Sequence, residues 1–240
     1  MFRKTLGYAL VAGVIVSSAA VAQDLTSGQT KGAADLKSAG PLAFGPQGIL
    51  FVGDPQGGAV FALSTGDTTG SPDQVKFEVA GLDQKIAAAL GTTPAEVMVN
   101  DLAVNPSSGR AYLSISRGRG PAATPVILVV DGSGKVSDLS LKEIAFSKAV
   151  LPNLPAAGEG KNNQRGESIT DLAYSDGHVI VAGLSNEEFS SNLRSIPFPF
   201  KSAEAGTAVE IYHGSHGRFE TKSPVRTFAI YKSGKEAQVL

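Results

Sequence analysis

The sequence contains no cysteine and no run of like charge. Without cysteine no disulfide can hold the fold, so its stability has to come from buried apolar surface and backbone pairing. The absence also excludes a lipoprotein anchor, because acylation requires a cysteine at the cleavage site. The 21 Lys and Arg residues nearly balance 22 Asp and Glu residues, and this mixture offers no electrostatic surface for nucleic acid or anionic lipid.

The N-terminus has the composition of a secretory signal peptide over residues 1–22. Two basic residues at positions 3 and 4 precede an apolar run at 6–16, and Ala20-Val21-Ala22 places small residues where signal peptidase reads them. Cleavage before Gln23 leaves a domain of 23–240 that is periplasmic or secreted and has no membrane contact. A retained membrane anchor is the other interpretation, although the apolar run is shorter than the roughly 20 residues that span a bilayer.

One pattern recurs three times after the signal segment. Residues 42–53, 102–114 and 172–183 each begin with Leu-Ala, pass through a turn rich in Gly, Pro, Asn, Asp or Ser, and end in an apolar run. Such segments predict two antiparallel strands joined by a tight turn. Further apolar runs at 59–63 and 126–130, and another from Lys135, indicate four strands per repeat.

A four-stranded sheet of this kind leaves apolar faces and open edges, so it persists only when it stacks against neighbours. We therefore predict an all-β fold, and we favour a β-propeller built from four-stranded blades over side-by-side stacking. The Leu-Ala hairpins resemble the blades of NHL-repeat and gluconolactonase-like (regucalcin-type) propellers. The resemblance implies a fold rather than a function, because many activities use this architecture.

The expected blades are 40–95, 96–165, 166–207 and 208–240. They exceed the roughly 40 to 50 residues of a usual blade, which indicates insertions. One insertion has helical composition at 83–90, and Thr93-Pro94-Ala95-Glu96 has the form of a capping box. Three and a half to four blades are few for a closed ring, so we expect an incomplete, truncated one; an open twisted array or a small sandwich is the alternative.

The candidate ligand residues stand at the strand starts, where the blades of a propeller converge. Just before the Leu-Ala pair lie Asn100-Asp101 in the second repeat and Thr170-Asp171 in the third. Asp101 and Asp171, joined by Glu167, offer the oxygen ligands that calcium takes. An aspartate at a strand start equally accepts hydrogen bonds from backbone amides, and this structural role is the competing interpretation.

The gluconolactonase-like resemblance also implies a ligand role for Asn100, as an oxygen donor to a divalent cation or to substrate. The same family pattern includes an early glutamate as a metal ligand. No Glu lies between Gln23 and Lys76, and this departure counts against lactonase activity.

Three further strings carry candidate chemistry. His213 and His216 have a spacing that can place two imidazoles near one metal, but the flanking glycines favour a turn with exposed histidines. Arg117 and Arg119 offer two guanidinium groups to an anionic ligand, or form a solvated loop. Residues 195–200 alternate Pro with Phe and form either a lip with exposed rings or an edge segment that packs on the next blade.

None of these strings completes a catalytic set. The leading hypothesis is an exported propeller that binds a small molecule, a glycan or a protein partner at its mouth. The second is a metal-dependent hydrolase of the gluconolactonase-like class, with Asn100 and Asp171 near a divalent cation such as calcium whose bound water is the nucleophile. A structural role in a surface complex is the third.

Overall fold

A computed structural model describes residues 24–158, 163–188, 190–201, 206–210, 212–215, 217–219, 221, 223–234 and 236–240. The expected signal peptide at 1–22 lies outside these residues. Within them, no helix has the length and apolar character needed to cross a bilayer.

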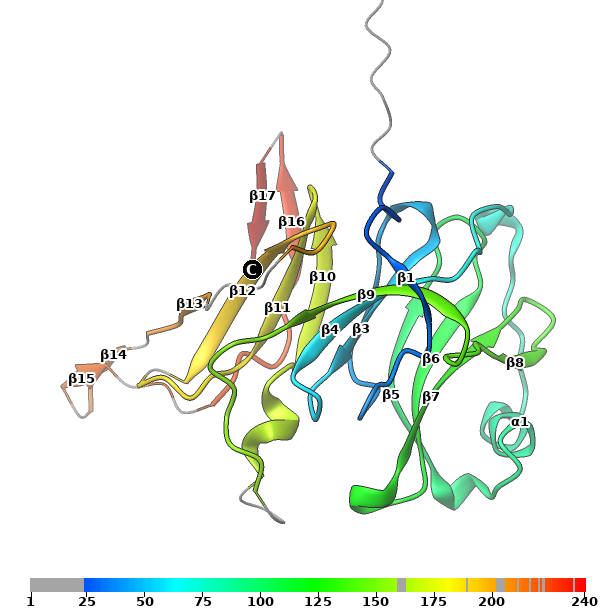
Figure 1. Cartoon of the computed structure of the whole chain (residues 1–240), viewed down its shortest axis with the longest axis horizontal. Helices are drawn as coiled ribbons and strands as arrows, with labels where there is room; N and C mark the ends of the chain where they lie inside the picture. The colour runs from blue at the N-terminus through cyan, green and yellow to red at the C-terminus, as the bar shows by residue number, and fades with distance from the viewer. Residues whose placement is uncertain are drawn as a thin grey trace, which may run out of the picture.

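Antiparallel strands are the dominant regular structure of the described chain, which confirms the all-β class (Figure 1). They form three sheets of four or five strands and two two-stranded hairpins. The central sheet has the order β1 (Thr30–Gly32), β9 (Ile144–Val150), β4 (Ala59–Ser64), β3 (Ile49–Asp54), β2 (Leu42–Phe44). A short 3-10 helix, η1 (Pro46–Gly48), makes the turn between β2 and β3.

Strands β3 and β4 are buried on both faces, because another sheet packs on each side of the central one. Their sequences are accordingly continuous apolar runs rather than an alternation of apolar and polar residues. The register pairs Phe51 with Ala62 and Leu50 with Leu63.

Strand β9 departs from the expected order of one sheet per repeat. The first repeat supplies only β2, β3 and β4, and its fourth strand comes from Ile144–Val150, inside the range 96–165 expected to form the second unit. That range therefore contributes to two sheets. The segment that follows β4 packs over the next sheet and does not pair with β4. Strand β9 therefore pairs with an edge of β4 that would otherwise stay open.

The second sheet runs β5 (Val97–Val104), β6 (Ala111–Arg117), β7 (Thr124–Val130), β8 (Val136–Asp138). The predicted helical insertion is present as α1 (Leu82–Ala89). Three 3-10 turns flank these elements: η2 (Pro72–Gln74), η3 (Pro94–Glu96) and η4 (Gly120–Ala122). The capping box expected at 93–96 does not form, because Thr93 makes no side-chain cap and η3 passes directly into β5.

The third sheet runs β10 (Asp171–Ser175), β11 (His178–Leu184), β12 (Ser191–Pro197), β13 (Thr207–Ala208), preceded by η6 (Gln164–Glu167). The expected fourth unit at 208–240 contains two hairpins. They are β14 (Tyr212–His213) with β15 (Arg218–Phe219), and β16 (Ile230–Ser233) with β17 (Glu236–Val239).

Three apolar clusters hold the layers together. One lies between the central sheet and the β10–β13 sheet, and a second between the central sheet and the β5–β8 sheet. The third lies between the β5–β8 sheet and α1, whose Ile86 is 1% exposed. The insertion thus covers a sheet face that would otherwise be open to water.

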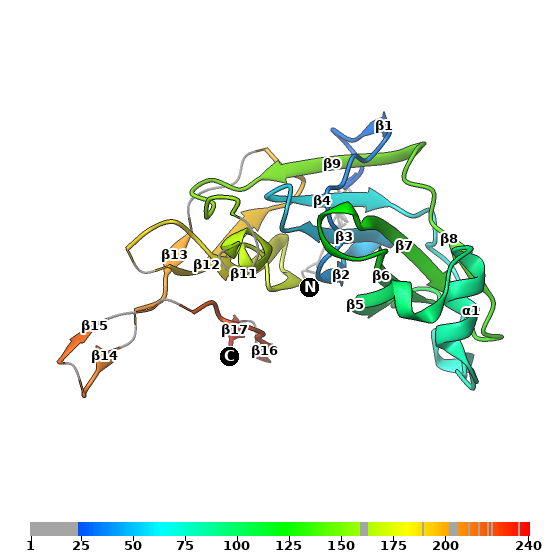
Figure 2. The ribbon, with the colours of Figure 1, turned by 90° about the horizontal axis from the view of Figure 1, so that it is seen from below.

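The innermost strands lie side by side in the order β5, β2, β10. Seen from below, the sheets spread outward from these strands as an open fan (Figure 2). The β16–β17 hairpin lies next to β10, since Lys232 pairs with Asp176 directly after that strand. The first repeat therefore occupies the middle of the fan. The described sheets do not close on themselves.

Candidate functional site

The starts of four inner segments line one cavity of about 410 Å³. In each repeat one cavity residue stands two places before the Leu-Ala pair, or before the Phe-Ala pair of the fourth segment. The four residues in this position are Gly40, Asn100, Thr170 and Arg226, which precede Leu42, Leu102, Leu172 and Phe228. Arg226-Thr227-Phe228-Ala229 is thus a fourth copy of the strand start, in which Phe replaces Leu.

Asn100 is placed in the cavity wall by an irregularity in its strand. The β5–β6 register shifts between Val99 and Asp101, so Asn100 is the extra residue of a β-bulge. Bulges re-aim a side chain and occur often beside binding sites. The Asn100 amide nitrogen donates to the Ala39 carbonyl oxygen at 2.7 Å and to Ser116 Oγ at 2.9 Å, which leaves its Oδ1 to accept.

A buried carboxylate fixes two further segments of the lining. Asp54, at the end of β3, is 1% exposed and accepts from the backbone N–H groups of Lys37 and Ser38, each at 2.8 Å, and of Gly57 at 2.9 Å. The Ser38 hydroxyl donates to the same carboxylate at 2.7 Å. A Cβ at position 57 would come within 2.1 Å of Asp54 Oδ2, so this turn requires glycine. Segments 37–41 and 55–57 are held rigidly as a result.

Arg226 is the one charged group among the described residues that line this cavity. Its Nη2 lies 2.6 Å from Glu167 Oε1 in an ion pair whose side chains are 64% and 36% exposed. Water screens a pair of this exposure, so the pair holds Arg226 only loosely. A guanidinium carries five donors, and the remaining ones are open to a ligand.

The two aspartates that recur in register act as clamps between neighbouring segments. Asp101 Oδ1 accepts from the N–H of Leu102 and Oδ2 from the N–H of Leu42 in the central sheet, both at 2.7 Å. Asp171 repeats this arrangement: Oδ1 accepts from Leu172 N–H at 2.8 Å and Oδ2 from Phe228 N–H at 2.9 Å. Each carboxylate therefore joins its own inner strand to one that lacks an aspartate.

The residues proposed as metal ligands do not fit a divalent cation. The carboxylates of Asp101 and Asp171 are committed to backbone amides of two different neighbours, and Glu167 faces Arg226. No three His, Asp or Glu side chains converge as a metal site in the described part of the chain. His213 lies in β14, and His216 is outside the described residues.

The two arginines of the Arg-Gly-Arg string do not act together, because they lie in different hollows. Arg117 lines one of about 440 Å³ beside α1 and residues 138–142. Arg119 lines another of about 690 Å³, which adjoins the cavity at the strand starts. Arg119 Nε and Nη2 both donate to the Ala95 carbonyl oxygen.

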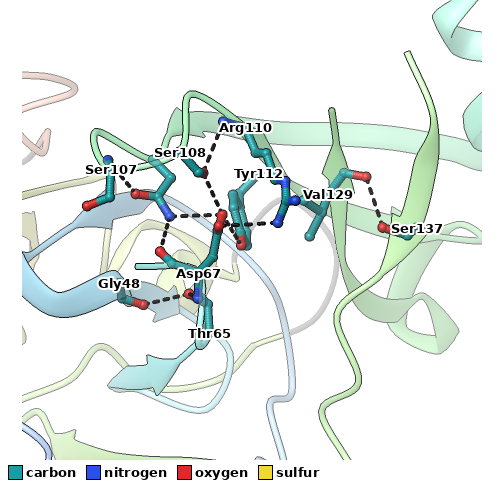
Figure 3. A network of polar contacts seen from close by, with 10 residues as sticks. Gly48, Thr65, Asp67, Ser107, Ser108, Arg110, Tyr112, Val129 and Ser137 are labelled. Atoms are coloured by element: carbon teal, nitrogen blue, oxygen red, sulfur yellow. Dashed lines mark hydrogen bonds and ion pairs between the residues drawn. The ribbon is translucent and has the colours of Figure 1, made fainter. Parts of the chain in front are cut away.

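A second polar network occupies the other end of the same strands and was not foreseen from the sequence (Figure 3). Asp67 follows β4, is 8% exposed, and accepts from Asn105, Ser108 and Tyr112 at 2.6–3.0 Å and from Arg110 at 3.2 Å. Burial, followed by the nearby Asp67 carboxylate, raises the pKa of Tyr112 to about 12. With its carboxylate saturated by donors, the network joins two sheets and offers no reactive group.

Comparison with protein-family models, curated proteins and solved structures found no match to this chain. The sequence led to Asn100 but not to Met98, Ser116, Gln56 or Arg226, which line the same cavity. Only Arg226 had a detectable signal, namely its place before a fourth copy of the strand start.

Proposed function

We propose that this protein is an exported, propeller-like binding module that takes a small molecule or a glycan at the mouth formed by its strand starts. The observation that carries the proposal is the convergence of four register-equivalent residues on one cavity. Inner strands that lie side by side and bring equivalent positions to one cavity support this proposal, because the ligands of propellers bind where the blades converge. The export of the protein is proposed from residues 1–22 of the sequence.

The chemistry of the lining supports binding rather than catalysis. Asn100, Thr170 and Ser116 supply amide and hydroxyl groups, Arg226 supplies a positive charge, and Met98 supplies an apolar surface. No nucleophile with an adjacent general base occurs among the described lining residues, and the carboxylates nearby are occupied. The concave shape favours a small ligand over the flat surface of a folded partner.

The proposal is tested by blocking the cavity. Met98 is 46% exposed and borders it, so Met98→Trp fills the space without disturbing the core, whereas Met98→Leu keeps the volume. The labelled protein is screened by NMR against a panel of neutral and charged mono- to trisaccharides and small carboxylates. We expect at least one member to shift the amide signals of Gln56, Asn100 and Ser116 in the wild type and in Met98→Leu, but not in Met98→Trp.

A panel that leaves these signals unchanged, or a response that persists in Met98→Trp, would contradict the proposal. The same preparation decides the hydrolase alternative. Stoichiometric calcium or zinc in the purified protein, or a rise in Tm when either ion is added, would favour a metal site; we expect neither.

A further inference from the structure

The cavity at the strand starts continues into a longer groove. The neighbouring hollow of about 690 Å³ shares four lining residues with it: Ser38, Gln56, Met98 and Ser116. The two spaces are thus adjoining parts of one groove, with Arg226 in the first part and Arg119 in the second. A ligand that fills both parts has to be elongated.

The charge along the groove has one sign. Arg226 lines the first part, and Lys37 and Arg119 line the second, whereas no carboxylate occurs among the described residues that line either part. Lys37 and Arg226 each have one carboxylate partner outside the lining, at 2.7 Å and 2.6 Å, in ion pairs that are largely exposed. Arg119 donates only to a backbone carbonyl, so its charge is not compensated by an acid among the described residues.

Between the charged ends lie neutral groups that suit hydroxyls. The Gln56 side-chain amide makes no hydrogen bond with the described residues, although its backbone N–H and carbonyl do. Ser116 Oγ accepts from Asn100 and keeps its own proton to donate, and Asn100 keeps its Oδ1 as an acceptor. No aromatic ring is present among the described lining residues, so stacking of a base or a flat ring is not the mode of binding.

We propose that this groove binds a short acidic oligosaccharide, with one carboxylate near Arg226, another near Arg119 and Lys37, and sugar hydroxyls on Gln56, Ser116 and Asn100. The inference rests on the proposed function and specifies its ligand class. Arginine suits this task because its planar fork pairs with a carboxylate through two parallel hydrogen bonds.

The experiment is calorimetric titration of the full chain with trigalacturonate. Two matched probes separate the parts of the proposal: the fully methyl-esterified trimer keeps the hydroxyls without the charge, and tri-glutamate keeps the charge without the hydroxyls. We expect trigalacturonate to bind at least about 10-fold more tightly than either probe, and its affinity to fall about 10-fold in Arg119→Gln and in Arg226→Gln. Lys31→Gln removes an exposed charge from β1, remote from the groove, and leaves the affinity unchanged.

A second measurement uses only the wild-type protein, so its result does not depend on whether the variants fold. The affinity of the wild type for trigalacturonate falls between 20 mM and 200 mM salt, while that for the ester does not. Absence of trigalacturonate binding, equal binding of the ester, or tighter binding of tri-glutamate would each overturn the acidic oligosaccharide. If another saccharide still binds and Met98→Trp abolishes that binding, the proposed function survives; if Met98→Trp has no effect, both fail.

Discussion

A carboxylate at the start of a strand can hold a metal or the backbone, and here two of them hold the backbone. Asp101 and Asp171 each accept one N–H from their own strand and one from the neighbouring segment. The arrangement explains why the aspartate need not occur in every repeat. Pro41 and Thr227 occupy the equivalent place in the two segments whose backbone N–H groups donate to these aspartates.

Removal of one clamp is expected to weaken the fold. Asp101→Ala leaves the N–H groups of Leu42 and Leu102 without their charged acceptor, and we expect the free energy of unfolding in urea to fall by about 2–3 kcal/mol. Asp35→Ala is the matched control, because that carboxylate is exposed and pairs only with exposed Lys37; we expect no measurable change. Equal stability of Asp101→Ala and the wild type would mean that water replaces the carboxylate at no cost.

At the residue level, the sequence predicts a candidate where a pattern is repeated. It does not predict a role that depends on contacts between distant parts of the chain. The recurrence of Asp101 and Asp171 is visible in the sequence, and Asn100 follows from the resemblance of its segment to gluconolactonase-like propellers. The role of these aspartates depends on Leu42 and Phe228, which lie 59 and 57 residues away in the chain. No local pattern carries that information.

At the level of elements, the turns and apolar runs predicted the hairpins well. The Pro-Phe alternation at 195–200 packs its rings rather than exposing them, since the Phe198 ring meets the Phe51 ring edge-on at 4.9 Å and the Phe200 ring lies 6.1 Å from it. These rings pack on the central sheet and not on the next blade, and β12 is paired on both sides. The pairing of β9 with β4 was not predictable, because the sequence of a strand specifies which face is apolar but not which distant edge it joins.

Helix α1 has a task that its sequence alone did not disclose, namely covering the β5–β8 sheet. Ile86 is 1% exposed and packs in the cluster that contains Leu113, Ile115 and Leu128. We expect Ile86→Ala to lower the free energy of unfolding by about 2–5 kcal/mol, since it leaves a cavity beneath the helix.

Gln84→Ala, on the exposed side of the same helix, serves as the control and should change stability by less than about 0.5 kcal/mol. Hydrogen exchange at β6 locates the effect. If Ile86→Ala unfolds like the wild type and β6 exchanges no faster, the helix does not stabilise this sheet.

For the whole molecule, the position of the first repeat in the middle of the fan is the feature that matters most. The sequence order suggested neighbours in the order of the repeats, whereas the central sheet contacts the sheets of both later repeats. The repeats do not predict this arrangement. The sheet of each repeat has two apolar faces, and its sequence does not specify which other sheet packs on either face. The site follows from the same arrangement, since four strand starts meet only when the segments lie around the central one.

The central sheet should also make the three sheets unfold as one unit. Leu50 and Phe51 are adjacent in β3, both fully buried, and point to opposite faces, Leu50 toward the β5–β8 sheet and Phe51 toward the β10–β13 sheet. We expect Leu50→Ala and Phe51→Ala each to lower the free energy of unfolding by about 3–5 kcal/mol, with a single urea transition in both.

Because the central sheet is shared, hydrogen exchange should accelerate in β11 in the Leu50→Ala variant, although Leu50 packs on the other side. Thr30→Ala, exposed in β1, should leave exchange in β6 and β11 as in the wild type. Two separate transitions, or acceleration confined to the sheet that each residue faces, would show that the sheets unfold independently.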